Sequence, residues 1–420
     1  MNQQTDGHDH FVIVSADTHV GPRLVEDLRS YCPARFLDEF DRFAAASDPA
    51  ALVALIGDHP NTRTAGHHDS AARLADYDGD GVTAGVIFHG SQNGQPLPFV
   101  ASGPADTAFD PELNAVGLDI YNRWLIDFVA QAPHRHIGLA QLPMWDIAAA
   151  GRELERAHDA GLKGANFPGM REGVICEYND PAWEPFWSLC EERNIPLVTH
   201  VGGGSNARYT GPETMALVAM ETGGWMARRA IWWMIFGGVF ERHPNLKLVI
   251  TETPGYWWAM TANELDSIYD MVGVKGRERF PAFAVQVPRR PSEYMSENVY
   301  FGASFAAPFE VEQAMNDGTD GHLLWGSDYP HAEGTFVYSG GRDMPSVTRL
   351  SLRNTFCDVP VERARRMLGE NAVEVYGLDR AALQAIADEI DAPTKAELST
   401  SIDAVPAGAS DQAFRTGVWT

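Results

Sequence analysis

The chain alternates eight times between a short apolar segment and a stretch of loop and helix, and this alternation restricts its fold more than any other feature. The segments have the Val, Ile and Leu content of buried strands: FVIVSADTH, GVTAGVIFHG, HIGLAQLP, GLKGANFPG, IPLVTHVGG, LKLVITETPG, NVYFGASF and HLLWGSDYPH. Amphipathic helices are predicted between several of them, at residues 147–160 and at 180–194, where Asp180 and Pro181 form the N-cap and first turn. Eight repeats of this kind favour an α/β fold, a closed (β/α)8 TIM barrel, over an open doubly wound sheet.

Two regions fall outside this repeat. Residues 24–69 form an insertion after the first strand, and residues 381–420 form an acidic, alanine-rich helical extension. We therefore expect one barrel domain over residues 1–380 and an extension that packs on it. Because the insertion starts at the C-terminal end of a strand, where such barrels carry their active sites, we expect it to act as a lid; a plain surface excursion is the alternative.

The composition excludes several kinds of partner. The 32 basic and 57 acidic residues give a formal net charge of −25, which repels nucleic acids and anionic membranes. The most apolar helical segment, residues 230–240, is about half the length that crosses a bilayer. The N-terminal sequence MNQQTDGHDH lacks the basic and apolar parts of an export signal, so we expect a cytoplasmic protein.

Polar residues gather where the predicted strands end. Asp17 and His19 end the first strand, His200 the fifth and Asp328 the eighth. The C-terminal ends of all barrel strands meet at one mouth, so these residues become neighbours. Asp17 and His19 are two positions apart and therefore face the same way, into the barrel. Two imidazoles and two carboxylates suit one divalent metal ion, with zinc as our first choice and manganese or iron as alternatives.

The segments resemble the amidohydrolase superfamily, specifically the amidohydrolase-related branch with metal-dependent hydrolases and the γ-resorcylate and aminocarboxymuconate semialdehyde decarboxylases. The matching motifs follow one another between residues 11 and 380: SADTHV, RLADYDGDGV, GLKGANFPG, PLVTHVGGG, IFGGVFERHPNLKLVITETPG, LLWGSDYPHAEGTF and SLRNTFCDVPVERARRMLGENAVEVYG. The resemblance implies a barrel with a catalytic metal held by Asp17, His19, His200 and Asp328. Glu252 takes the place of the common strand-six histidine, which adds a fifth candidate ligand.

Three reactions are compatible with this site. Our first expectation is a hydrolase, in which a metal-activated water attacks a C–N or C–O bond and Asp328 or Glu252 accepts the proton. The first alternative is a non-oxidative decarboxylase of an aromatic or unsaturated acid, with His331 and Glu252 as candidate acids. The second alternative is an oxygenase with a dinuclear iron site, because Asp17, Glu252 and Asp328 supply three carboxylates.

Four further residues are candidates for contact with the substrate. They follow strands two, four, five and six: His89, Asn166, Arg208 and Trp257. The many aromatic residues of these loops suit a small organic acid with an apolar or aromatic body.

We interpret several other side chains as having no catalytic role. Lys163 lies too early in its strand to bridge two metals as a carbamylated lysine, and we expect His67, in the insertion, to be solvated. Trp232, Trp233 and Phe236 share one short helix and exceed what the outer layer of a barrel needs. We therefore expect a homodimer or higher homo-oligomer.

Overall fold

The computed structural model describes residues 9–57, 59–100, 110–168, 174–202, 214–253, 255–274 and 287–417. Eight parallel strands form one sheet in sequence order. They are β1 (Val14–Val20), β2 (Ala84–His89), β3 (His136–Ala140), β4 (Gly164–Asn166), β5 (Leu197–His200), β6 (Leu248–Thr251), β7 (Val299–Ser304) and β8 (Leu323–Gly326). Each of the eight predicted segments contains one of these strands.

The sheet closes on itself just beyond β8. The amide of Asp328 donates to the carbonyl of Asp17 at 3.0 Å, and the amide of His19 donates to the carbonyl of Tyr329 at 2.6 Å. Both bonds join the segment after β8 to β1. The predicted (β/α)8 TIM barrel is therefore confirmed.

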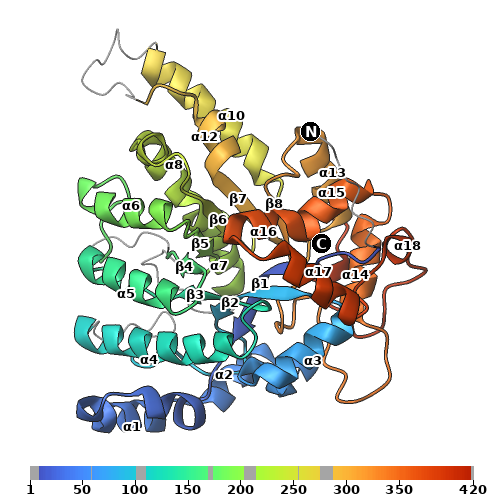
Figure 1. Cartoon of the computed structure of the whole chain (residues 1–420), viewed down its shortest axis with the longest axis horizontal. Helices are drawn as coiled ribbons and strands as arrows, with labels where there is room; N and C mark the ends of the chain where they lie inside the picture. The colour runs from blue at the N-terminus through green and yellow to red at the C-terminus, as the bar shows by residue number, and fades with distance from the viewer. Residues whose placement is uncertain are drawn as a thin grey trace.

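Helices surround the barrel in the same order as the strands. Those that follow β1 to β8 are α3 (Ser70–Asp80), α4 (Pro111–Ala130), α5 (Ile147–Asp159), α6 (Glu184–Glu192), α8 (Arg229–Phe236), α10 (Trp257–Tyr269), α13 (Pro308–Asp317) and α14 (Val347–Phe356), and α12 (Pro291–Asn298) precedes β7. Figure 1 shows α4, α5 and α6 side by side along one side of the molecule and α14 on the opposite side. No helix in the described ranges is both long and apolar enough to span a bilayer.

Helix starts agree with the capping signals of the sequence. The carboxylate of Asp146 accepts from the amide of Ala149 at the start of α5, and that of Asp180 accepts from Ala182. Pro181 then opens a short 3-10 turn, η6 (Pro181–Trp183), which leads into α6. Each carboxylate satisfies an amide that a helix start leaves without a partner.

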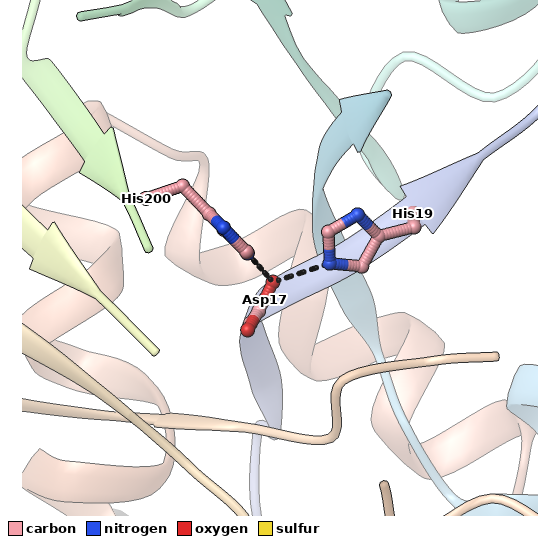
Figure 2. A group of neighbouring side chains, drawn as sticks. All are labelled: Asp17, His19 and His200. Carbon is pink, nitrogen blue, oxygen red and sulfur yellow. Dashed lines mark ion pairs between the residues drawn. The ribbon is translucent and has the colours of Figure 1, made fainter. Parts of the chain in front are cut away.

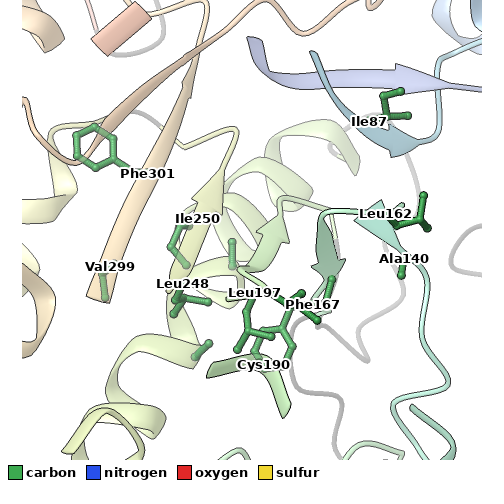
Figure 3. Close-up of a cluster of buried hydrophobic side chains, with 14 of the residues drawn as sticks. Ile87, Ala140, Leu162, Phe167, Cys190, Leu197, Leu248, Ile250, Val299 and Phe301 are labelled. Carbon is green, nitrogen blue, oxygen red and sulfur yellow. The ribbon is translucent and has the colours of Figure 1, made fainter. Parts of the chain in front are cut away.

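Two layers of apolar side chains lie on the two faces of the sheet. Successive strand residues point to opposite faces, so Val86 lies in the barrel interior and Ile87 lies between the strands and the helices. Figure 3 shows this outer layer, with Ile87, Leu248 and Phe301 among its members. The layers hold the strands in register and so fix where their C-terminal ends lie.

The insertion after β1 is built of short helical pieces, which include α1 (Leu37–Ala46) and α2 (Pro49–Ile56). Its last part is anchored in the protein, because Asn61 donates to the carbonyls of His331 and Phe336 at 3.1 and 2.8 Å. The prediction that His67 is solvated is wrong. Its side chain is buried, with one ring nitrogen 2.8 Å from Ser91 Oγ and the other donating to the carbonyl of Asn61. The lid function of the insertion stays a prediction.

The C-terminal part returns to the barrel. Its helices are α15 (Val361–Arg365), α16 (Asn371–Tyr376), α17 (Arg380–Glu389) and α18 (Lys395–Leu398). Val375 of α16 and Leu383 of α17 belong to the same apolar cluster as the barrel interior. The extension thus packs on the barrel, and its separation as a unit at residue 381 stays a prediction.

Candidate active site

Asp17 and His19 lie in the second half of β1, where a bulge turns them toward the barrel interior. The register between β1 and β2 shifts by one residue within residues 15–18. Plain alternation from Val14, which faces the interior, would direct Asp17 and His19 to the opposite face. The extra residue of the bulge reverses this, and His19 pairs with Phe88, a member of the interior cluster.

The other candidate ligands come from strands five, six and eight. His200 is the last residue of β5, Glu252 follows β6 directly, and Asp328 lies two residues beyond β8. Glu252 and Asp328 have backbone φ angles of 56° and 55°. Residues other than glycine rarely adopt this left-handed conformation, which costs about 1 kcal/mol or more, and such residues cluster at functional sites.

Asp17 lies at the centre of the cluster. Its Oδ1 is 3.1 Å from Nε2 of His19 and 3.4 Å from Nε2 of His200, as Figure 2 shows. Nε2 of His19 also lies 3.3 Å from Oδ1 of Asp328, and Nε2 of His200 lies 3.4 Å from Oε2 of Glu252. The structure therefore brings all five predicted ligands together at the barrel mouth.

Main-chain carbonyls orient two of the imidazoles. Nδ1 of His19 donates to the carbonyl of His89 at 3.1 Å, and Nδ1 of His200 donates to the carbonyl of Val201 at 2.9 Å. A carbonyl only accepts, so the proton of the neutral ring is on Nδ1 and the lone pair on Nε2. Both lone pairs then face Asp17, the arrangement of histidines that bind metals.

The atoms that face each other in the cluster lack ordinary partners. Oδ1 of Asp17, Nε2 of His19, Nε2 of His200 and both carboxylate oxygens of Asp328 are buried without a hydrogen bond among the described residues. Leaving such groups unpaired is costly. One divalent cation bound by these nitrogen and oxygen atoms would satisfy them together, so the residues fit the metal that the sequence implies.

The electrostatics of the cluster are those of a strongly coupled site. Burial raises the pKa of Asp17, but the nearby imidazoles of His200 and His19 outweigh this effect and hold the pKa well below its usual range. Burial lowers the pKa of His200, but Asp17 and Glu252 raise it to about 9. Burial, with the charges of Asp328 and Asp17, raises the pKa of Glu252 well above its usual range, against the effect of His200. The carboxylates of Asp17 and Glu252 and the imidazole of His200 therefore do not titrate independently.

His331 lies beside this cluster. Its ring stacks on that of His19 with the centroids 3.9 Å apart, Nε2 donates to the carbonyl of Gly90, and Nδ1 lies 2.9 Å from Oδ1 of Asp328. Burial lowers the pKa of His331, but the charge of Asp328 outweighs it and raises the pKa to about 10. His331 therefore holds a proton on Nδ1 at neutral pH in the metal-free protein.

Two residues that the sequence reasoning missed complete the site. A carboxylate oxygen of Glu333 lies within 4.8 Å of ligand atoms of Glu252 and Asp328. Its position two residues after His331, in YPHAEG, was the available signal. Ser304, the last residue of β7, donates to Oδ2 of Asp17 at 2.5 Å and so orients that carboxylate. Nothing in the sequence distinguishes this serine from any other at a strand end.

The predicted substrate residues have different surroundings. The ring of His89 is half-buried and lies edge-on to Tyr121. Arg228 lies over the ring of Trp257, which is buried. Asn166, the last residue of β4, is half-buried. Arg208 lies outside the described residues. The substrate contacts of all four stay predictions, whereas Lys163 precedes β4, away from the mouth, as expected.

Comparison with known proteins gives a family and several relatives. A family model described as amidohydrolase matches residues 91–378, well over half of the chain. Among curated proteins, the chain is 28% identical over 220 residues to γ-resorcylate decarboxylase from a Polaromonas species, covering 50% of this chain and 64% of that one. It is also 28% identical over 264 residues to 2-amino-3-carboxymuconate-6-semialdehyde decarboxylase from Dictyostelium discoideum, covering 61% and 66%. The matched part thus spans less than two thirds of either relative.

Solved structures support the same architecture. The crystal structure of 5-carboxyvanillate decarboxylase from Novosphingobium aromaticivorans, complexed with manganese and 4-hydroxy-3-methoxy-5-nitrobenzoic acid, superposes with a TM-score of 0.62. The match covers 88% of this chain and 96% of that one at 17% identity. At this identity the likeness is evidence for the fold alone.

Proposed function

The chain belongs to the amidohydrolase family, and we propose that it is a metal-dependent decarboxylase of a small aromatic or unsaturated acid. The observation that carries the proposal is the convergence of Asp17, His19, His200 and Asp328 on one buried point with their ligand atoms unpaired. The curated relatives described above act by decarboxylation, which favours this reaction over the hydrolysis that we expected first. Hydrolysis is supported only by the family as a whole.

Asp17, His19, His200 and Asp328 are the proposed ligands of the catalytic metal. A bound divalent cation would neutralise the substrate carboxylate and an adjacent oxygen, and so keep an anionic substrate in an acidic protein. The solved decarboxylase structure with a related fold is complexed with manganese, and two of the four proposed ligands are carboxylates. We therefore propose manganese as the first metal to test, before zinc and iron. Ser304 and the carbonyls of His89 and Val201 hold these ligands in orientation.

His331 is the proposed proton donor. In decarboxylation the bond between the carboxyl group and a carbon atom of the substrate breaks, and its electron pair stays on that carbon. A proton must be added there as carbon dioxide leaves. In the metal-free protein Nδ1 of His331 carries a proton and lies 2.9 Å from Oδ1 of Asp328, which places a proton donor beside the proposed ligands. Glu252, whose pKa is raised well above its usual range mainly by burial, is the second candidate donor.

A panel of carboxylated phenols and unsaturated carboxylic acids tests the reaction. We expect carbon dioxide release from at least one member with manganese, and loss of this activity with a chelator. His331→Asn should reduce kcat about 100-fold or more with little change in KM, because a proton transfer is removed and binding is not. Cleavage of esters, amides or lactones by the metal-loaded protein, without carbon dioxide release from the panel, would instead favour the hydrolase interpretation.

We also propose that the chain self-associates. Leu217, Met220, Trp225, Met260, Ile268 and Met271 are large apolar side chains exposed on the elements between residues 214 and 274. Two of them, Trp225 and Ile268, also line a cavity of about 200 Å³. Exposed apolar groups concentrated in one region are typical of protein interfaces. Light scattering of the purified protein tests this, and a monomer at micromolar concentration would contradict it.

A further inference from the structure

Arg73, the first residue of the motif RLADYDGDGV, is a buried cation that the proposed function does not use. Its side chain is fully buried in α3, the helix that follows the insertion. Among the described residues, the guanidinium donates to main-chain carbonyls and to a hydroxyl and not to a carboxylate, and its Nε has no partner. A buried charge without an ion pair is costly, so the groups around it must compensate for the lost hydration.

The guanidinium fixes the main chain at His19, a proposed metal ligand. One terminal nitrogen donates to the carbonyl of His19 at 2.7 Å, and the other donates to Oγ1 of Thr18 at 2.6 Å. The amide of His19 donates to the carbonyl of Tyr329, and its Nδ1 donates to another main-chain carbonyl. Within the described part of the chain, Nε2 is therefore the one polar atom of His19 without a hydrogen bond, and it faces the other proposed ligands.

The same guanidinium packs against the segment that contains Asp328. Its central carbon lies 4.7 Å from the ring centre of Tyr329 and 5.0 Å from that of Tyr77. Tyr329 follows Asp328 directly, and its hydroxyl donates to Oδ2 of Asp76 at 2.7 Å. Tyr329 is thus held both at its ring and at its hydroxyl, which limits how far the neighbouring Asp328 can move.

These contacts depend on the shape of an arginine side chain. A planar guanidinium donates from two nitrogens to two acceptors while its faces lie against aromatic rings. A lysine ammonium has the same charge but lacks both the fork and the flat face. His19 and Asp328 are far apart in the sequence, and Arg73 contacts the segments of both.

We propose that Arg73 is a positioning residue of the metal centre, which holds the segments of His19 and Asp328 at the separation that a shared cation requires. The inference rests on the metal centre of the proposed function and is independent of the reaction that the centre catalyses. A group that orients metal ligands alters the affinity and the coordination geometry of the metal. A group that only stabilises the fold alters the unfolding temperature alone.

Calorimetric titration of two Arg73 variants with manganese tests the inference. The full chain is freed of metal by chelator and titrated with MnCl₂. We expect Arg73→Lys to lower the Mn²⁺ affinity about 10-fold or more, and Arg73→Met to lower it further, since such groups typically contribute 10–100-fold.

Arg135→Met is the matched control. Arg135 donates to the carbonyls of Val82 and Thr83, just before β2 and therefore at the end of the barrel opposite the mouth. This change should lower the Tm of the metal-free protein and leave its Mn²⁺ affinity equal to that of the wild type.

Electron paramagnetic resonance of bound Mn²⁺ gives a second readout, which does not depend on stability or activity. The spectrum reports the arrangement of the ligands, so Arg73→Lys should alter it and Arg135→Met should not. Wild-type affinity with an unchanged spectrum in every Arg73 variant that folds would overturn the inference. A wild type without measurable Mn²⁺ binding would overturn both the inference and the proposed metal centre. Weaker binding by the Arg73 variants of a protein that decarboxylates nothing would support the inference and contradict the proposed reaction alone.

Discussion

The hydroxyl of Ser304 controls how Asp17 can bind a cation. It donates to Oδ2 of Asp17 and leaves Oδ1 directed at His19 and His200. Groups that orient a metal ligand in this way typically contribute 10–100-fold to metal affinity. We therefore expect Ser304→Ala to weaken Mn²⁺ binding about 10-fold or more in a calorimetric titration of the metal-free protein. Ser296→Ala, an exposed serine of α12, is the control. Equal affinities in all three proteins would show that Asp17 needs no such support.

We expect Asp80, which lies outside the proposed metal site, to make a pH-dependent contribution to stability. This last residue of α3 is buried and accepts hydrogen bonds from Ser346 and Thr348 at the start of α14. Burial raises the pKa of Asp80 from 3.8 to about 6, although both hydroxyl groups act in the opposite direction. The folded protein thus binds this proton more tightly than the unfolded chain does, so the contribution is complete below pH 4 and is lost as the pH rises through 6.

Asp80→Asn, which cannot ionise, tests this linkage. The free energy of unfolding of the wild type, relative to that of the variant, should fall by about 2 kcal/mol between pH 4 and pH 7, since the two pKa values of Asp80 differ by about two. Urea denaturation of both proteins at intervals across this range measures the difference. A difference that is independent of pH would mean that Asp80 has the same proton affinity in the folded and unfolded states.

The strands and the bulge in β1 show what sequence alone can and cannot predict. The eight strands follow from local apolar segments, and the site residues follow from where those segments end, so both were predicted. The bulge depends on how β1 pairs with β2, about 70 residues away. Plain alternation would have directed Asp17 away from its partners, so the correct expectation of a shared cluster relied on a feature that the pattern does not contain.

Long-range contacts also explain why the position of Glu333 and the burial of His67 were not predicted from the sequence. Glu333 joins Glu252 and Asp328 only because the loop after β8 is held in place by contacts with the insertion, such as those of Asn61. His67 is buried for a related reason, since Ser91 and Asn61 supply its hydrogen bonds. A histidine in a polar insertion gives no local sign of such partners. Contacts between segments distant in sequence are what periodicity and composition do not report.

A buried ion pair joins the C-terminal segment to the loop after β7. Arg415 donates to the carboxylate of Glu310 and to the carbonyl of Phe305, the residue that follows Ser304, and both charged side chains are buried. Glu310 also accepts from the amide of Ala307 at the start of α13. Residues near the C-terminus therefore fix the end of a strand that contributes to the metal site.

Replacing one member of the Arg415–Glu310 ion pair should destabilise the protein more than replacing both. Arg415→Met leaves the carboxyl of Glu310 buried and unpaired, so we expect a loss of about 3–5 kcal/mol of stability, and the added change Glu310→Gln should recover part of it. Arg342→Met, at an exposed arginine, should change stability by less than about 0.5 kcal/mol. Denaturation of the wild type, both single variants, the double variant and the control measures these terms, and additive losses in the double variant would contradict a direct pair.

At the scale of the whole molecule, the proposed metal site brings together strand ends that lie far apart in the sequence. Its candidate ligands belong to β1 and β5 and to the segments that follow β6 and β8. The chain carries a formal net charge of −25, and four of its carboxylates lie at close range in this site. Without a cation, their repulsion opposes the closed arrangement of these strand ends.

Metal removal should therefore destabilise the whole barrel. A cation that binds only the folded state stabilises it by RT ln(1 + [L]/Kd), about 4 kcal/mol when the free cation is at 1,000 times its Kd. We expect a chelator to lower the Tm of the wild type by several degrees and MnCl₂ to restore it in a concentration-dependent way, measured by differential scanning calorimetry. His200→Asn, which lacks one proposed ligand, should respond much less to MnCl₂. If the Tm of the wild type is the same with chelator and with MnCl₂, the cluster of Asp17, His19 and His200 does not bind this cation in the folded protein.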